Sequence, residues 1–212
     1  LTRSSAASDV YKRQQFTDQK NGNFFIRQSF ALLKDNMLPN LKNNLENLAK
    51  KLKADFFLSR IECPMNTVIL VSRFDHCLND ILFRVRNDSL NLKIKAVISN
   101  HKIAETIANF SNIPFHYLPI EKSNKLAQEE KLKEILHTNN VELIILARYM
   151  QVLSEKLVNE YVGKIINIHH SFLPSFKGAK PYHQAFVRGV KVIGATAHYV
   201  TKDLDEGPII EQ

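Results

Sequence analysis

Cysteine is scarce in this chain of 212 residues, and long apolar runs are missing. The two cysteines, Cys63 and Cys77, form neither a close pair nor a CxxC motif, which argues against a disulfide framework and a zinc ribbon. We expect both to be small buried residues. No stretch approaches the roughly 20 apolar residues that span a bilayer, and no basic-then-apolar leader opens the chain. We therefore expect a cytoplasmic protein with no membrane partner.

Positive charge is in excess, with a formal net charge of +8 and an isoelectric point near 9.4. The lysines are nevertheless spread along the chain and mixed with acids and amides. The densest cluster contains Lys42, Lys50, Lys51 and Lys53, and it shares one predicted helix with Glu46 and contains no aromatic residue. This pattern indicates a solvated helix face and no nucleic-acid partner. The positive field would instead favour a small anionic substrate.

The first 60 residues differ in pattern from the rest. Residues 1–14 show neither helical nor strand periodicity, which predicts a disordered tail or a foreign piece. Residues 15–60 contain a predicted strand at 23–30, an amphipathic helix at Leu38–Leu52 and a second strand at 54–59. Such a unit is too small for a core of its own, so we interpret it as part of a larger α+β module. The last residues, 207–212, end within a strand-like run, which suggests a catalytic part (61–212) that is truncated at its C-terminus.

From residue 67 onward, apolar strands alternate with helices. This alternation predicts an α/β fold, with a mostly parallel Rossmann-like sheet covered by helices on both faces. In open sheets of this kind, ligands bind beyond the carboxyl ends of the strands. The expected strands are 67–72, 93–99, 115–119, 142–147, 164–169 and 191–200. The expected helices are 77–86, 102–110, 124–136, 155–161 and 183–188.

The expected strand at 164–169 ends in unusually polar residues. Asn167 and His169 are two positions apart, so an extended strand places them on one face, and Asp205 follows the last strand. An amide, an imidazole and a carboxylate together suit acyl chemistry. The amide and the imidazole can hold a developing oxyanion, while the carboxylate orders a water molecule. The alternative is a hydrogen-bond network that only closes a loop. Ser171 lies outside a GxSxG elbow, which argues against a serine hydrolase.

Two other site types find little support. A metal site could be built from histidines, but no HExxH or HxH pattern is present. Its candidate ligands would be His169, His170, His183 and His198. The turn after the strand at 67–72 contains no glycine, which excludes a dinucleotide or ATP phosphate loop of the usual kind.

The same stretches resemble a known family. The residues Asn167, Ile168, His169, Ser171, Leu173, Pro174, Asp205, Gly207 and Pro208 match the pattern N-I-H-x-S-x-L-P with a later Asp near Gly-Pro. That pattern is typical of formyltetrahydrofolate hydrolases and transferases. From Phe16 to Gln212 the chain is most similar to the formyltetrahydrofolate deformylase branch. The resemblance implies a formyltransferase fold preceded, at 15–60, by a partial ACT-type regulatory module.

The resemblance also implies roles for individual residues. His169 would polarise the formyl oxygen, Asn167 would donate to it, and Asp205 would act on the water. Met150, Gln151, Val152 and Leu153 would hold the pterin, although their apolar members also suit simple core packing. The folate would be the substrate, 10-formyltetrahydrofolate, with no permanently bound cofactor and no metal. Its hydrolysis would supply formate for purine synthesis, in a homo-oligomer with amino-acid effectors such as methionine and glycine.

Members of this family differ in the acceptor of the formyl group, which is water in the hydrolases and an amine in the transferases. Transferases that act on glycinamide ribonucleotide carry a glycine-rich turn after the first strand, which cradles a phosphate. This chain has Phe74 and Asp75 in that turn, so we expect water to be the acceptor. Formyl transfer to an amine remains an alternative. A non-catalytic module that binds folate or an amino acid is another.

Overall fold

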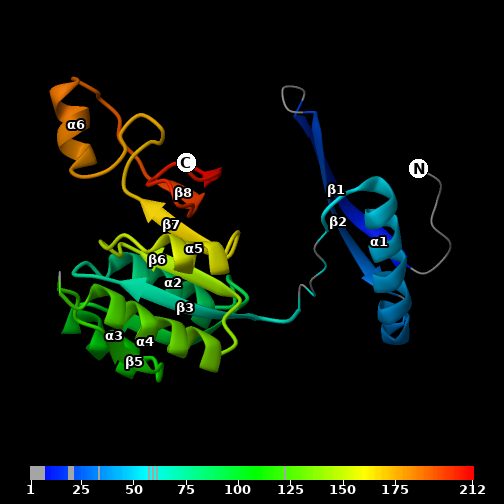
Figure 1. Ribbon diagram of the computed structural model, residues 1–212, viewed down its shortest axis with the longest axis horizontal. Helices are drawn as coiled ribbons and strands as arrows, with labels where there is room; N and C mark the ends of the chain where they lie inside the picture. Colours follow the sequence, from blue (N-terminus) through cyan, green and yellow to red (C-terminus); the bar gives the residue numbers. More distant parts are fainter. Residues whose placement is uncertain are drawn as a thin grey trace. The chain divides into compact units, whose positions relative to one another are not determined.

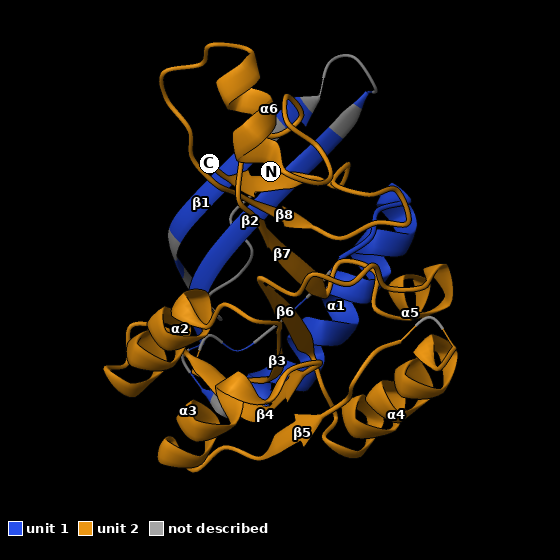
Figure 2. Ribbon diagram, turned by 90° about the vertical axis from the view of Figure 1, so that its left-hand side faces the viewer, with its two compact units in different colours: residues 1–60 blue, residues 61–212 orange. Residues whose placement is uncertain are grey.

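The computed structural model describes residues 8–18, 22–32, 34–56, 58, 60, 62–121 and 123–212. It divides into two compact units, residues 1–60 and 61–212, which are drawn in different colours in Figure 2.

The first unit is a hairpin followed by a helix. Strand β1 (Ser8–Asp18) pairs antiparallel with β2 (Asn23–Leu32), and a short 3-10 helix, η1 (Asp35–Met37), leads into α1 (Leu38–Leu52). The structure therefore corrects the expectation of disorder for residues 8–14, because these residues pair with β2. Residues 1–7 lie outside the described residues. Helix α1 has the predicted bounds and ends at Lys53, which adopts a left-handed conformation.

Two expectations, one for this unit and one for the cysteines of the second unit, need correction. The described part of the expected strand at 54–59, residues 54–56 and 58, is not a strand. Its apolar pattern has no partner strand among the described residues to complete a ladder. Cys63 is exposed, so the expectation that it is buried is wrong, whereas Cys77 is half-buried and packs against a hydrophobic core of the second unit.

The second unit is built on one seven-stranded sheet with the order β5-β4-β3-β6-β7-β8-β9. The five strands from β5 to β7 are parallel, and β8 and β9 continue the sheet in antiparallel pairing. The mostly parallel sheet that we predicted is thus present. The strands are β3 (Met65–Val71), β4 (Leu92–Ser99), β5 (Phe115–Tyr117), β6 (Leu143–Ala147), β7 (Ile165–His169), β8 (Thr196–Tyr199) and β9 (Ile209–Glu211).

Helices cover both faces of this sheet (Figures 1 and 2). One core lies under α4 and α5 and contains Val68, Leu70 and Ile165, while the other lies under α2 and α3 and contains Ile69 and Val71. Residues of β3 alternate between the two cores, as strand geometry requires. The helices are α2 (His76–Arg86), η2 (Lys102–Ala104), α3 (Glu105–Phe110), α4 (Lys125–Thr138), α5 (Glu155–Glu160) and α6 (Pro181–Val187). In the described part of the chain, no helix has the length and apolarity to cross a membrane.

The expected strand at 191–200 is much shorter in the structure. Only Thr196–Tyr199 form β8, and residues 191–195 approach the sheet as an irregular segment. Gly194 in this segment packs closely on the loop after β7, since a Cβ atom there would lie 2.5 Å from the Phe172 ring. The apolar residues before β8 therefore follow the shape of the loop after β7 instead of a strand ladder.

Candidate active site

The pairing of β7 with β8 brings four polar side chains into two cross-strand pairs. Asn167 lies opposite His198, and His169 lies opposite Thr196. Because each pair is two residues from the next on both strands, all four share one face of the sheet. His169, Thr196 and His198 are buried, and Asn167 is half-buried. A buried set of this kind needs internal partners.

Asp205 supplies a central partner to both histidines. Its Oδ2 lies 3.5 Å from His169 Nδ1, and its Oδ1 lies 3.7 Å from His198 Nε2. Oδ2 also accepts a hydrogen bond from the Gly178 N–H at 2.9 Å. The Asp205 backbone has φ of +55°, in the left-handed region that non-glycine residues rarely occupy. The structure thus brings together the three residues that the sequence singled out, at the carboxyl end of β7.

His198 sets the orientation of the Asn167 amide. Its Nδ1 lies 3.0 Å from the Tyr199 carbonyl oxygen, which can only accept, so Nδ1 carries the proton. In the neutral ring Nε2 is then an acceptor, and the Asn167 Nδ2–H donates to it over 3.1 Å. The second Asn167 N–H remains for another acceptor. Sequence reasoning considered His198 only as a metal ligand, although its alternation with Thr196 in an apolar strand was a visible signal.

His169 has a backbone partner that the sequence did not suggest. Its Nε2 lies 2.9 Å from the Phe176 carbonyl oxygen, so Nε2–H is the donor. A protonated ring can then direct Nδ1–H toward Asp205. The loop that contains Phe176 follows the cis peptide bond between Leu173 and Pro174. Phe176 contributes through its carbonyl group, which every residue type carries, and therefore no sequence signal could have found it.

Two further contacts hold the loops around this network. Thr196 Oγ donates to the Ser171 carbonyl at 2.7 Å and accepts from the Leu173 N–H at 3.1 Å. Gly207 lies so close to Tyr199 that a Cβ atom would stand 1.7 Å from the Tyr199 carbonyl oxygen. That same oxygen accepts from His198. Gly207, of the Gly-Pro pair that follows Asp205, is therefore required for the Asp205 loop to pack against β8.

The segment after β6 lies next to β7 and contains the four residues predicted to hold the pterin. Its Met150 N–H donates to Ser72 Oγ at 3.0 Å, and the Ser72 hydroxyl donates to Asn100 Oδ1 at 2.7 Å. Met150 and Val152 are each 56% exposed, so these two are not core residues, whereas Leu153 packs against the core under α4. The alternative of simple core packing thus applies to Leu153 alone.

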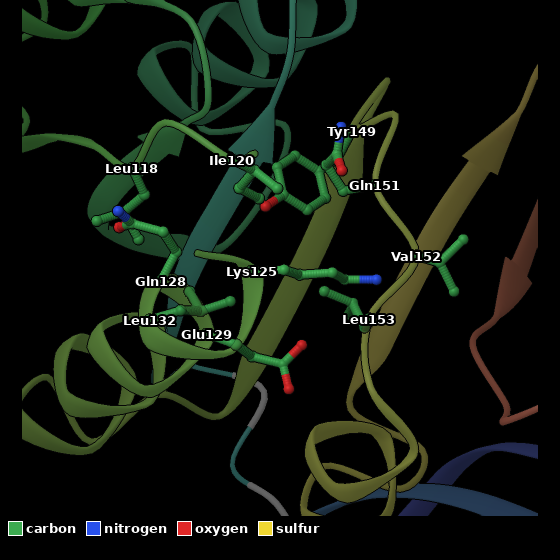
Figure 3. A pocket seen from close by; sticks show the side chains of 10 residues that line it. All are labelled: Leu118, Ile120, Lys125, Gln128, Glu129, Leu132, Tyr149, Gln151, Val152 and Leu153. Atoms are coloured by element: carbon green, nitrogen blue, oxygen red, sulfur yellow. The ribbon is translucent and has the colours of Figure 1, made fainter. Parts of the chain in front are cut away.

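A small pocket opens beside this segment, between it and α4 (Figure 3). Lys125 extends across the pocket from α4, and Glu129 binds the Ser154 backbone N–H at 2.9 Å. Burial, together with the nearby Glu129 carboxylate, raises the pKa of Tyr149. The lining residues are Leu118, Ile120, Lys125, Gln128, Glu129, Leu132, Tyr149, Gln151, Val152 and Leu153.

His170 directly follows β7, and its ring lies beside those of His169 and Tyr182. Its ring centroid is 5.4 Å from that of His169 and 5.2 Å from that of Tyr182. Burial, with smaller contributions from the positive charges of Arg148 and His169, lowers the pKa of His170 to about 4. His183 belongs to α6. Among the described residues, no three His, Cys, Asp or Glu side chains are arranged to hold a metal ion.

Comparisons with known proteins place the chain in a family. Residues 65–212 match the family model described as formyl transferase. A formyltetrahydrofolate deformylase from Corynebacterium sp. (strain P-1) is 46% identical over 204 residues, which are 96% of this chain and 71% of that protein. The crystal structure of the Burkholderia mallei ATCC 23344 formyltetrahydrofolate deformylase covers 97% of this chain at 42% identity, with a TM-score of 0.87. The alignment spans 73% of that structure's chain.

A transferase of the family is less similar. The crystal structure of the phosphoribosylglycinamide formyltransferase from Anaplasma phagocytophilum covers 69% of each chain at 35% identity, with a TM-score of 0.62. The deformylases thus match almost the whole described chain, whereas this transferase matches a smaller part of it. The chain therefore belongs to the formyl transferase family, within its formyltetrahydrofolate deformylase branch.

Proposed function

We propose that the protein hydrolyses 10-formyltetrahydrofolate to formate and tetrahydrofolate. The observation that carries the proposal is the buried network of Asn167, His169, His198 and Asp205 at the carboxyl end of β7, in a chain that belongs to the deformylase branch. The folate enters as the substrate. Its pterin would rest against residues 150–153, where Met150 and Val152 offer exposed apolar surface beside the network.

The reaction joins one water molecule to the formyl group. The water oxygen attacks the formyl carbon, the bond from that carbon to N10 breaks, and N10 takes a proton. Formate leaves as an anion, with net release of one proton. Negative charge develops on the formyl oxygen before the C–N bond breaks, so donors placed around that oxygen lower the barrier most.

Each network residue has a role that its contacts allow. The free Asn167 N–H donates to the formyl oxygen, and the substrate oxygen replaces the Phe176 carbonyl as acceptor of His169 Nε2–H. Asp205 Oδ1 lies 3.7 Å from His198 Nε2, beyond hydrogen-bonding distance, and can accept a proton from the water. His198 acts through Asn167 and Asp205, so we consider it a positioning residue.

Water is the acceptor that best fits the turn between β3 and α2. The turn contains no glycine that would let the backbone wrap around a phosphate, and Asp75 places a carboxylate there. Arg148 and Phe74 stack in the same place, with the guanidinium carbon 5.4 Å from the ring centroid. A phosphorylated amine would have to displace this pair.

The test is the fate of the formyl group. The purified protein should release one formate for each 10-formyltetrahydrofolate consumed, and glycinamide ribonucleotide should change neither the rate nor the products. Mass spectrometry of the ribonucleotide checks the second expectation. Formylated ribonucleotide in place of free formate would show a transferase, and folate binding without turnover would show a non-catalytic module.

We also propose that the first unit is part of an ACT-type regulatory module that joins copies of the chain and senses amino acids such as methionine or glycine. Its hairpin exposes Val10, Phe24 and Ile26 by 46–55%, which is apolar surface that an assembly could cover. Ile26→Lys should then lower the mass measured by analytical ultracentrifugation, and methionine or glycine should change the rate of the parent. An unchanged mass would remove the hairpin from the interface.

A further inference from the structure

Arg148 occupies an unusual backbone position beside the reaction centre. The register of β6 and β7 places Leu146 opposite Asn167, so Arg148, two residues later, is level with His169. Its φ is +60°, in the left-handed region where long side chains are rare. Strained conformations of this kind concentrate at functional sites, where the side chain must point in one direction.

Among the described residues, the Arg148 guanidinium has no carboxylate partner. Its Nε is buried without a hydrogen-bond partner, and no carboxylate of the described residues lies within 4.0 Å of it. Asp75, in the nearby turn, is among the carboxylates that make no such pair. The guanidinium instead rests over the exposed Phe74 ring. Partly buried charges are normally paired, so a guanidinium without a carboxylate partner is available to an anionic ligand.

The direction in which Arg148 points separates it from the catalytic network. Asn167 and His169 share a strand face with Ile165, which packs under α4 and α5, while Ile168 packs under α2 and α3. Phe74 precedes α2, so Arg148 lies on the α2 side. His170, whose ring lies beside that of His169, has a pKa of about 4 and is uncharged near neutral pH. Arg148 therefore carries a fixed and partly buried positive charge there, whereas Arg73 in the neighbouring turn is exposed.

We infer that Arg148 is the site that receives the formate product. The inference rests on the proposed function, because formate is the anion which that hydrolysis creates. A planar guanidinium binds a carboxylate through two parallel hydrogen bonds, and the Phe74 face holds the fork in place. Formate would move from the position of the formyl carbon toward the α2 side. This direction takes it away from Asp205, because the two negative charges repel each other.

Formate binding can be measured without turnover. Titration of the protein with ¹³C-formate, followed by NMR, gives a dissociation constant for the parent and each variant. Arg148→Gln should raise that constant by about ten- to a hundredfold, the usual effect of losing a charge-assisted pair. Arg148→Lys should restore binding in part. Arg73→Gln is the matched control, because it removes an exposed charge from the turn that contains Phe74 and should leave the formate constant unchanged.

Other outcomes would overturn the inference. An unchanged formate constant in a folded Arg148→Gln protein would do so, as would a parent that binds no formate. A raised KM for the folate with unchanged formate binding would assign Arg148 to the carboxylates of the folate tail. Phe74→Leu keeps the arginine and should weaken formate binding by less than Arg148→Gln does. This second variant keeps the inference testable if Arg148→Gln fails to fold. Formate binding without hydrolysis would refute the proposed function and leave the anion site in place.

Discussion

Replacing Asp205 by asparagine tests the proposed mechanism most directly. The change removes one negative charge and keeps the shape of the side chain, and the new amide oxygen can still accept from the Gly178 N–H. What disappears is the carboxylate between His169 and His198, at 3.5 Å and 3.7 Å from their ring nitrogens. The effect should therefore be electrostatic and should leave the fold intact.

The size of the effect follows from the distance and the burial. When His169 is protonated, as it would be while it stabilises the developing oxyanion, two unit charges 3.5 Å apart attract by about 5 kcal/mol at an effective dielectric constant of about 20. The side chains of His169 and Asp205 are each only 6% exposed, so water screens the pair weakly. Loss of a positioned acid–base group typically slows a reaction by about 10²–10⁴-fold. We expect kcat to fall by a factor in that range, while the affinity for the folate changes little.

The assay compares formate release by the parent, Asp205→Asn and Asp203→Asn. Asp203 is exposed in the same loop, so its variant controls for general changes in charge. Binding of tetrahydrofolate, measured by calorimetry, shows whether the pterin site is kept. Hydrolysis by Asp205→Asn at near the parent rate would make Asp205 a structural residue and would refute the mechanism.

Three further predictions concern the neighbours of Asp205. Asn167→Ala and His198→Ala should each slow formate release. In the double variant the rate should fall by less than the product of the two single losses, because the two side chains act as one unit. Strictly multiplicative losses would show independent roles. Gly207→Ala should lower the melting temperature measured by calorimetry, because its Cβ would overlap the Tyr199 backbone, and an unchanged value would contradict that packing. The pKa of His170 is lowered from 6.5 to about 4, so the unfolded state binds more protons between these values and stability falls as the pH drops through them. His170→Gln should therefore lose less stability than the parent between pH 7 and pH 4 in thermal melts, and an equal loss would remove His170 as the cause.

Some of the structure followed from local pattern and some did not. The apolar spacing in residues 38–52 predicted the bounds of α1, and the apolar runs of β6 and β7 predicted those strands to within one residue. The polar residues 8–14 carry no such pattern, because β1 is held by pairing with β2 and its apolar residues do not alternate. Periodicity reports which face is buried, so it misses a strand of this kind.

The candidate site shows the same division. The alternation of Asn167 and His169 placed both on one face, and the residues themselves indicated acyl chemistry. The link from Asn167 to His198 depends on the register of two strands that are 31 positions apart at this pair, which no local pattern contains. The Phe176 carbonyl is independent of residue type. Long-range pairing and backbone groups were therefore beyond sequence reasoning.

The cross-strand pairing of β7 and β8 also makes the site indivisible. Sliding either strand by one residue would turn its polar pair toward α2 and α3 and would present Ile166 and Ile168, or Ala197 and Tyr199, in its place. The polar set can therefore be kept or lost only as a whole. Inserting one residue inside either strand should remove all activity, whereas an insertion in the loop between α6 and β8 moves none of the four side chains. Transplanting the site into another protein requires both strands together.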